Sequence, residues 1–195
     1  MGYALSWLAV RGKLPEQVLA DLNATPTGAE IDFAERRLGG RKLRSGWYAV
    51  FAKQTDHPWM DPDTLSVLSS SAELLACTVN ENRLFTSVEL WRAGEQVWQV
   101  LHDGQQAYDH LRIVGEPPAP FAGIAVDHRK LQAAAGGAKA VIDHMFQVPP
   151  KLAQRVTGFK HDEGDAGAEA SWTELHDGPV MPKPAEVAKP WWKRW

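Results

Sequence analysis

The sequence predicts a single α+β domain built on a mainly antiparallel sheet, with helices packed on one side of the sheet. Three observations lead to this fold class. Strand-like apolar runs follow one another across very short turns, other segments carry apolar residues at helical spacing, and the overall composition is that of a globular protein. Hydrophobic residues make up 44% of the 195 residues and charged residues 23%, which is close to the average for folded domains.

The N-terminal part of the chain alternates strand and helix patterns. Residues 4–10 are rich in strand formers, and residues 14–23 carry apolar side chains on one helical face. Residues 46–53 predict a strand because aromatic and β-branched side chains favour a pleated surface. The segment Asp61-Pro62-Asp63 predicts the start of a short helix, with proline in the first turn. Residues 31–45 show little periodicity, and we expect a loop there, with a short strand inside it as the alternative.

The middle of the chain predicts a three-stranded antiparallel meander over about residues 73–102. Residues 73–79, 84–91 and 97–102 are strand-like. The segments between them are short and contain Asn, Gly and Glu, so consecutive strands have room only for tight turns. We therefore expect three neighbouring antiparallel strands.

The C-terminal part predicts a long helix, another strand, a last short helix and then a change in composition. The helices are expected over residues 117–135 and 149–157, with the strand at 141–148. Beyond residue 162 the chain is rich in Gly, Ala, Pro and acidic residues and has few large aliphatic side chains. We expect a domain over residues 1–162 and a flexible tail over 163–195.

Composition excludes several classes of function. The single cysteine, Cys77, excludes an internal disulfide framework and a cysteine-built zinc site, and it predicts a reducing, cytoplasmic location. A net charge of −3 argues against a nucleic-acid partner. No apolar run approaches the roughly 18 residues of a transmembrane helix. Nucleotide-binding and metalloprotease motifs are absent as well, so we expect neither a cofactor nor a bound metal.

Candidate catalytic residues come from the histidines, because all seven have an aspartate next to them in the sequence. Adjacent side chains point away from each other in both strands and helices, so an acid–base pair has to be assembled by the fold. The two best candidates are His102 with Asp103 and His161 with Asp162. Each pair follows a predicted element, where loops come together.

Two segments are candidates for binding a partner. The first carries five cations in nine residues and suits an acidic partner, or the acidic C-terminal tail of the chain itself. Its members are Arg36, Arg37, Arg41, Lys42 and Arg44. The second is the aromatic and cationic C-terminus, which suits a groove on a protein or the headgroup layer of a membrane. Its aromatic residues are Trp191, Trp192 and Trp195.

Two motifs carry a resemblance to known proteins. One is Trp98-x-Val100-x-His102-Asp103, and the other is Val148-Pro149-x-x-Leu152-Ala153, which leads to Thr157-Gly158-Phe159-x-His161-Asp162-Glu163. With these motifs, about 160 residues of the chain resemble a group of small, uncharacterised bacterial proteins. No activity comes with the resemblance. Single-domain bacterial proteins of this sort often act as immunity or adaptor partners of toxin systems, and the resemblance implies such a role.

These observations favour a non-enzymatic protein that acts by occupying a protein partner. One alternative is a small enzyme or ligand-binding domain with a site assembled around His102, Asp103, His161 and Asp162. Another is a peripheral membrane protein that attaches through the C-terminal tryptophans.

Overall fold

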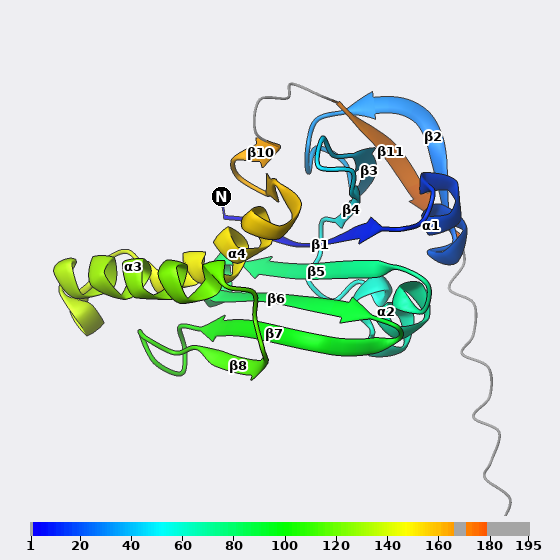
Figure 1. The fold of residues 1–195 in the computed structure, drawn as a ribbon. Helices are drawn as coiled ribbons and strands as arrows, with labels where there is room; N and C mark the ends of the chain where they lie inside the picture. Colours follow the sequence, from blue (N-terminus) through cyan, green and yellow to red (C-terminus); the bar gives the residue numbers. More distant parts are fainter. Residues whose placement is uncertain (1, 166–170, 179–195) are drawn as a thin grey trace, which may run out of the picture.

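The computed structural model describes residues 2–165 and 171–178, in which nine strands form one sheet (Figure 1). Every neighbouring pair in this sheet is antiparallel. In spatial order the strands are β2 (Ala24–Ile31), β11 (Trp172–Asp177), β3 (Leu38–Lys42), β4 (Tyr48–Ala52), β1 (Ala4–Arg11), β5 (Glu73–Asn80), β6 (Phe85–Arg92), β7 (Glu95–Asp103) and β8 (Arg112–Gly115). Two short strands, β9 (Phe159–Lys160) and β10 (Gly164–Asp165), pair separately.

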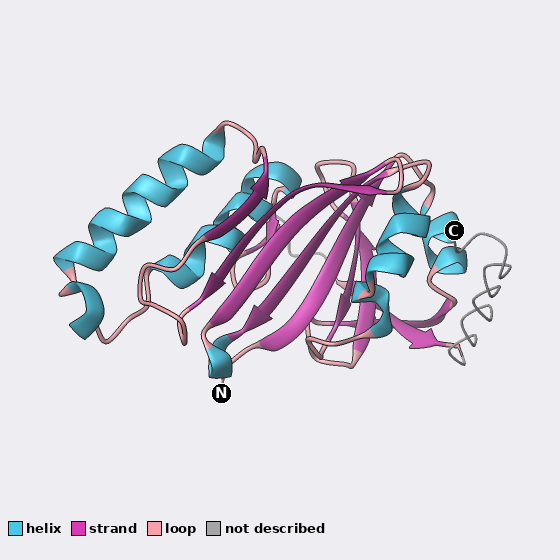
Figure 2. Ribbon diagram, turned by 90° about the horizontal axis from the view of Figure 1, so that it is seen from below, coloured by secondary structure: helices cyan, strands magenta, loops and turns pink. Residues whose placement is uncertain are grey.

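Helices cover both faces of the sheet (Figure 2). The α-helices in the described residues are α1 (Pro15–Asp21), α2 (Pro62–Ser69), α3 (Pro120–Ala134) and α4 (Val148–Thr157). This mixture of helices with an antiparallel sheet is the α+β class that the sequence predicts.

The expected placement of all helices on one side is wrong. On one face of β1, Trp7 belongs to the apolar cluster that contains Leu152 of α4. On the other face, Leu8 belongs to the cluster that contains Leu65 of α2. Residues 5–10 of β1 are all buried, which is typical of a central strand with cover on both sides.

Strands β5, β6 and β7 lie side by side and carry the buried residues that face α3 and α4. Cys77 of β5 is opposite Val88 of β6, and Val88 is opposite Val100 of β7. All three side chains are fully buried in one cluster. The alternation along β7 also turns His102 toward this interior.

The position of strand β11 shows that the domain does not end at residue 162, where the sequence predicts its boundary. It pairs with β2 on one side and with β3 on the other, so it lies inside the sheet. Trp172 is only 2% exposed, and its ring packs against Phe33, Phe51 and Phe159. The local composition does not predict this strand, because the strands with which β11 pairs lie more than 120 residues earlier in the chain. The domain therefore extends at least to Asp177.

Of the two expectations for residues 31–45, a loop or a loop with a short strand, the structure has the second, because β3 lies there. Gly39 and Gly40, which resemble a turn in the sequence, instead make room for aromatic rings on the neighbouring strand. A Cβ atom at Gly39 would lie 2.5 Å from Cε1 of Phe51, and one at Gly40 would lie 2.6 Å from the hydroxyl of Tyr48. The strand expected at residues 141–148 is not formed, and a 3₁₀ turn (Met145–Gln147) leads directly into α4 there.

Candidate functional site

The four candidate acid–base residues lie in two separate surroundings. His102 is in β7 and contacts Asp143 and His110. His161 follows β9 and contacts Tyr3 and Asp162. Within residues 2–165 and 171–178, none of these contacts joins one pair to the other.

His102 forms a buried ion pair with Asp143. The imidazole is 0% exposed, and its Nε2 atom lies 2.8 Å from Oδ2 of Asp143. Its Nδ1 atom lies 2.6 Å from the backbone carbonyl oxygen of His110. Because a carboxylate and a carbonyl can only accept, both ring nitrogens have to donate, and the ring carries a positive charge.

The pKa values of the pair agree with this protonation state. Burial opposes the charged ring, but the hydrogen bonds to Asp143 and to the His110 carbonyl outweigh it and raise the pKa of His102. Burial also opposes the charged carboxylate, but the hydrogen bond from His102 lowers the pKa of Asp143. An imidazolium with both N–H groups engaged has no lone pair for a base or a metal ligand. The pair therefore fastens β7 to the segment before α4.

Asp103 stabilises the turn that follows β7. Its carboxylate accepts from the backbone N–H of Gln105 at 3.1 Å and from the side chain of Gln106 at 3.0 Å. Its own backbone N–H donates to Nδ1 of His110 at 2.9 Å. Asp103 thus closes a turn and is not hydrogen-bonded to the neighbouring His102 ring.

His161 differs from His102 because its ring is buried without a hydrogen bond to any described residue. The side chain is 1% exposed, and neither ring nitrogen has a hydrogen-bond partner among the described residues. Nδ1 lies 3.8 Å from Oδ1 of Asp162, but that carboxylate is engaged at 2.7 Å by Nζ of Lys160. Burial lowers the pKa of His161, so its imidazole is neutral at pH 7.

A cavity of about 590 Å³ lies against His161. Tyr3 meets the imidazole edge-on, with ring centroids 5.0 Å apart. Aromatic residues form much of the remaining wall, and two carboxylates and one guanidinium also line it. The residues concerned are Phe33, Phe159, Trp172, Asp32, Asp162 and Arg41.

The basic segment is largely matched by acidic residues of the same chain. Nη2 of Arg41 lies 2.9 Å from Oδ2 of Asp165, and both side chains are buried. The guanidinium of Arg41 also lies over the ring of Trp172, 5.4 Å from its centroid. Arg41 is therefore part of the interior and is not available to an external partner.

Other cations of this segment also meet the C-terminal part of the domain. Arg37 lies 3.2 Å from Asp177, and Arg36 lies 3.9 Å from Glu174. Lys42 ends β3, and the backbone N–H of Arg44 donates to Asp165 at 3.2 Å. The aromatic candidates Trp191, Trp192 and Trp195 lie outside the described residues.

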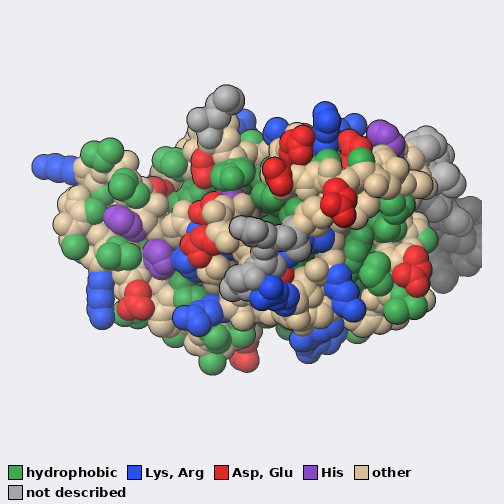
Figure 3. All heavy atoms as spheres, turned by 90° about the horizontal axis from the view of Figure 1, so that it is seen from above, with side chains coloured by type: hydrophobic (Ala, Val, Ile, Leu, Met, Phe, Trp, Pro, Cys, Tyr) green, Lys and Arg blue, Asp and Glu red, His purple; other side chains and the backbone are tan. Residues whose placement is uncertain are grey.

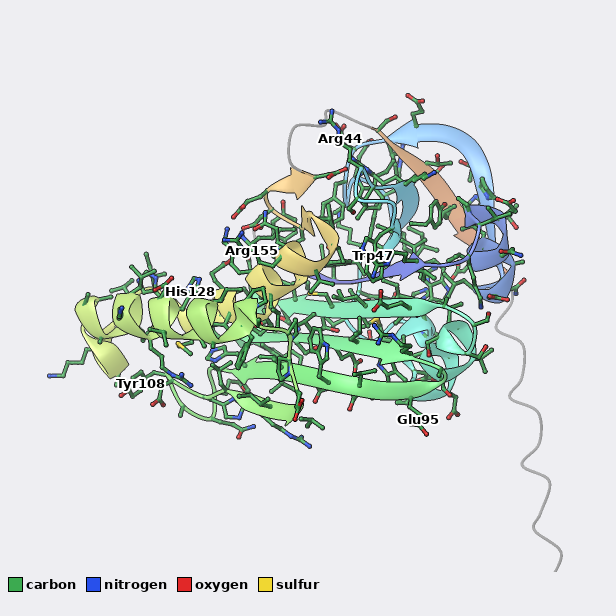
Figure 4. All side chains as sticks on the ribbon, viewed as in Figure 1. Arg44, Trp47, Glu95, Tyr108, His128 and Arg155 are labelled. Atoms are coloured by element: carbon green, nitrogen blue, oxygen red, sulfur yellow. The ribbon has the colours of Figure 1, made fainter. Side chains whose placement is uncertain are left out.

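Exposed apolar side chains gather at one end of the molecule. Twelve large hydrophobic side chains are exposed among the described residues, and eight of these come from β7, β8, α3 and the loops beside them. The eight are Val97, Tyr108, Ile113, Val114, Val126, Leu131, Val141 and Ile142. Figure 3 shows hydrophobic side chains around the α3 end, and Figure 4 places Tyr108 below the far end of that helix.

The two edges of the sheet differ in character. Strand β2, at one edge, carries Pro26, Gly28 and Glu30, which weaken or prevent pairing with a further strand. Strand β8, at the other edge, has four exposed residues and includes Ile113 and Val114. Within the described residues β8 pairs only with β7, so its outer edge is open.

Among the described residues, no group of three or more His, Cys, Asp or Glu side chains is placed to hold a metal ion. The thiol of Cys77 is buried, and burial raises its pKa, so it is not an activated nucleophile. None of the described helices has the length and apolar character needed to cross a membrane.

Comparisons with family models, curated proteins and solved structures gave no match to the chain.

Proposed function

We propose that this chain is a non-enzymatic protein that acts by binding a protein partner, in the adaptor- or immunity-like role that the sequence resemblance implies. The observation that carries the proposal is the outer edge of β8, where Ile113 and Val114 are exposed and with which no described strand pairs. An exposed apolar edge strand is a template for pairing with another chain.

The proposed contact is the addition of a partner strand to β8. The backbone of β8 supplies hydrogen bonds to the added strand, and side chains on the two faces of the sheet select its residues. Ile113 is opposite Val100, which belongs to the apolar cluster beneath α3 and α4. Val114 is opposite Gln99, so it lies on the other face. A partner strand with apolar residues at alternate positions therefore fits the face of Ile113.

Strand β8 alone is shorter than a stable interface requires, because typical protein complexes bury about 800 Å² on each partner. Further area is available from the loop after α3, where the exposed fractions are 101% for Val141 and 65% for Ile142. The His102–Asp143 ion pair fastens this loop to β7. The proposed interface thus combines a strand edge with a loop held at a fixed position.

The proposal is tested by affinity capture with full-length protein and two matched variants. Ile113→Lys with Val114→Lys places charges at the β8 edge and is expected to reduce binding of the captured partner at least tenfold. Val67→Lys changes an equally apolar residue on α2 that is 67% exposed, and it is expected to retain binding. If both variants bind alike, the edge-strand proposal is wrong.

Two further experiments distinguish partner binding at β8 from self-association and from attachment through the C-terminal tryptophans. Sedimentation of the protein alone tests whether a second copy pairs at β8, which would replace the partner proposal with a homodimer. Replacement of Trp191, Trp192 and Trp195 by alanine tests the C-terminal anchor against the same partner and against liposomes. Loss of liposome binding without loss of partner binding would favour peripheral membrane attachment.

A further inference from the structure

The cavity beside His161 is separate from the β8 edge, because β5, β6 and β7 lie between β8 and the residues that line the cavity. Its volume of about 590 Å³ falls within the range of small-molecule sites. The cavity also lies against a buried imidazole, that of His161, whose polar atoms are unpaired among the described residues. Polar side chains in an interior normally find a hydrogen-bond partner, whereas both nitrogens of His161 lack one among the described residues.

The neutral imidazole of His161 has one N–H group and one lone pair to offer. The lowered pKa of His161, which follows from its burial, keeps that lone pair free of a proton at pH 7. Among the described residues, the only ring packed directly on the imidazole belongs to Tyr3, which is 36% exposed. An exposed side chain changes rotamer readily, so Tyr3 can uncover the imidazole for a ligand.

The other walls of the cavity favour a positive charge. Asp32 is an exposed carboxylate at the cavity lining, whereas the carboxylate of Asp162 is already paired with Nζ of Lys160 at 2.7 Å. The charge of Arg41 is balanced by Asp165 at 2.9 Å. Phe33 and Trp172 add aromatic surface, and the guanidinium of Arg41 over Trp172 shows that this wall already accepts a cation on its π-face.

We propose that this cavity binds a small organic cation, in which an ammonium or guanidinium group is carried on a flat apolar body. One N–H group of the cation donates to the free ring nitrogen of His161. The carboxylate of Asp32 lies at the lining to balance the charge, and the apolar body packs against Tyr3 and Phe33. The site thus provides an acceptor, a negative charge and aromatic walls for one ligand.

The test uses the full chain and three probes of nearly the same shape: phenethylamine, 2-phenylethanol and 3-phenylpropionate. Binding is followed by NMR through the ring protons of His161 and by thermal shift. Phenethylamine is expected to bind at least tenfold more tightly than the other two. It is also expected to lower the titration midpoint of His161, because a hydrogen bond to the lone pair stabilises the neutral ring. A lysine-containing tripeptide, blocked at both ends, tests whether the cation can come from a peptide.

Three variants locate the binding. His161→Phe keeps an aromatic ring but removes the acceptor, and it is expected to lose at least tenfold in affinity for phenethylamine. Asp32→Asn changes only an exposed residue and is expected to reduce the preference for the cation over the alcohol. His176→Phe, at an exposed histidine of β11, is the matched control and is expected to leave binding unchanged. Equal binding of all three probes, no binding of any probe, or full binding by Asp32→Asn and His161→Phe would overturn the proposal.

Discussion

His102 and Asp143 form an ion pair between two parts of the chain that are 41 residues apart. The side chains are 0% and 13% exposed, and Nε2 lies 2.8 Å from Oδ2. Asp143 is fixed further by the backbone N–H of Phe146, which donates to Oδ1 at 3.1 Å. A buried charge is tolerated only when it is paired and hydrogen-bonded. Both charges meet this condition, so the loop between α3 and α4 has one preferred position on β7.

Replacement of Asp143 by asparagine is expected to destabilise the domain. The change leaves the His102 ring without its counter-charge, and hydrogen bonds to charged groups contribute about 1.5–3 kcal/mol. Urea unfolding of Asp143→Asn should show a loss of this size. Asp109→Asn, at an exposed loop position, is the control and should unfold like the original protein. A loss below 0.5 kcal/mol, on the order of a surface substitution, would mean that the pair contributes no net stability.

The contribution of this pair is also expected to depend on pH. The pKa of His102 is raised by folding, so its contribution is complete below the ordinary histidine value of about 6.5 and is lost as pH rises through the folded value. The pKa of Asp143 is lowered, so its contribution is present above about pH 4 and is lost as pH falls through the folded value. The difference in unfolding free energy between the original protein and Asp143→Asn should therefore be larger at pH 5.5 than at pH 9.

This comparison isolates the pair from the other histidines. The pKa values of His57, His128 and His161 are lowered, mainly by burial, so each of them favours unfolding as pH falls. These contributions occur in both proteins and cancel in the difference. A difference that grows between pH 5.5 and pH 9 would contradict the assigned charge on His102.

The elements that could be predicted from the sequence are those with local signals. Strand β4 has a dense run of aromatic and β-branched residues, and α2 follows Asp61 with a proline in its first turn. Helix α4 ends at Thr157 and is capped by Gly158, whose φ of 82° is the left-handed conformation that favours glycine. In each case the neighbouring residues are sufficient to select the conformation.

The elements that were missed depend on distant residues. Gly39 and Gly40 resemble a turn until Phe51 and Tyr48 of the next strand are known. Strand β11 obtains its partners from β2 and β3, which no local pattern indicates. The role of Asp143 was not recognised, because the sequence predicts a strand over residues 141–148. An aspartate whose carboxylate accepts from the backbone N–H three residues later is a common capping pattern, and Asp143 stands in this relation to Phe146. This pattern is the sequence signal for its structural role.

The close approach of Phe51 to Gly39 leads to a prediction about packing. Gly39→Ala places a methyl group 2.5 Å from Cε1 of Phe51, and such overpacking costs about 1–3 kcal/mol. Gly123→Ala is the matched control, because its added Cβ meets nothing within 4 Å and lies within α3. Alanine is favoured over glycine in a helix by roughly 0.5–1 kcal/mol, so this variant should be stabilised. Thermal unfolding should thus shift in opposite directions for the two variants.

Arg41 and Arg37 both pair with carboxylates of the C-terminal part of the domain, and they are expected to differ in importance. Arg41→Met leaves Asp165 buried and without its counter-charge, which costs about 3–5 kcal/mol. Arg37 is 62% exposed in its pair with Asp177, and exposed pairs contribute about 0–1 kcal/mol. Denaturation with urea should therefore separate Arg41→Met clearly from Arg37→Ala. Equal effects would show that burial does not decide the strength of these contacts.

The place of β11 inside the sheet makes a prediction about shortened chains. A chain that ends at Glu163 loses Asp165, Trp172 and the pairing of β2 and β3 with β11. Loss of a buried tryptophan side chain costs about 3–5 kcal/mol, and removal of Asp165 leaves Arg41 buried without its counter-charge. Together these losses are comparable to the whole stability of a typical domain, which is about 5–15 kcal/mol.

A chain that ends at Gly178 keeps all of these contacts and is the matched control. It also keeps the hydrogen bond from the Gly178 backbone N–H to the carbonyl of Asn23, at 2.7 Å. Circular dichroism should show a cooperative thermal transition for this chain, whereas the chain that ends at Glu163 should lack one or melt far lower. The fluorescence of the buried tryptophans should report the same difference, because exposure to water shifts their emission to longer wavelength. If both chains unfold at the same temperature, β11 is dispensable, and the domain ends near residue 162.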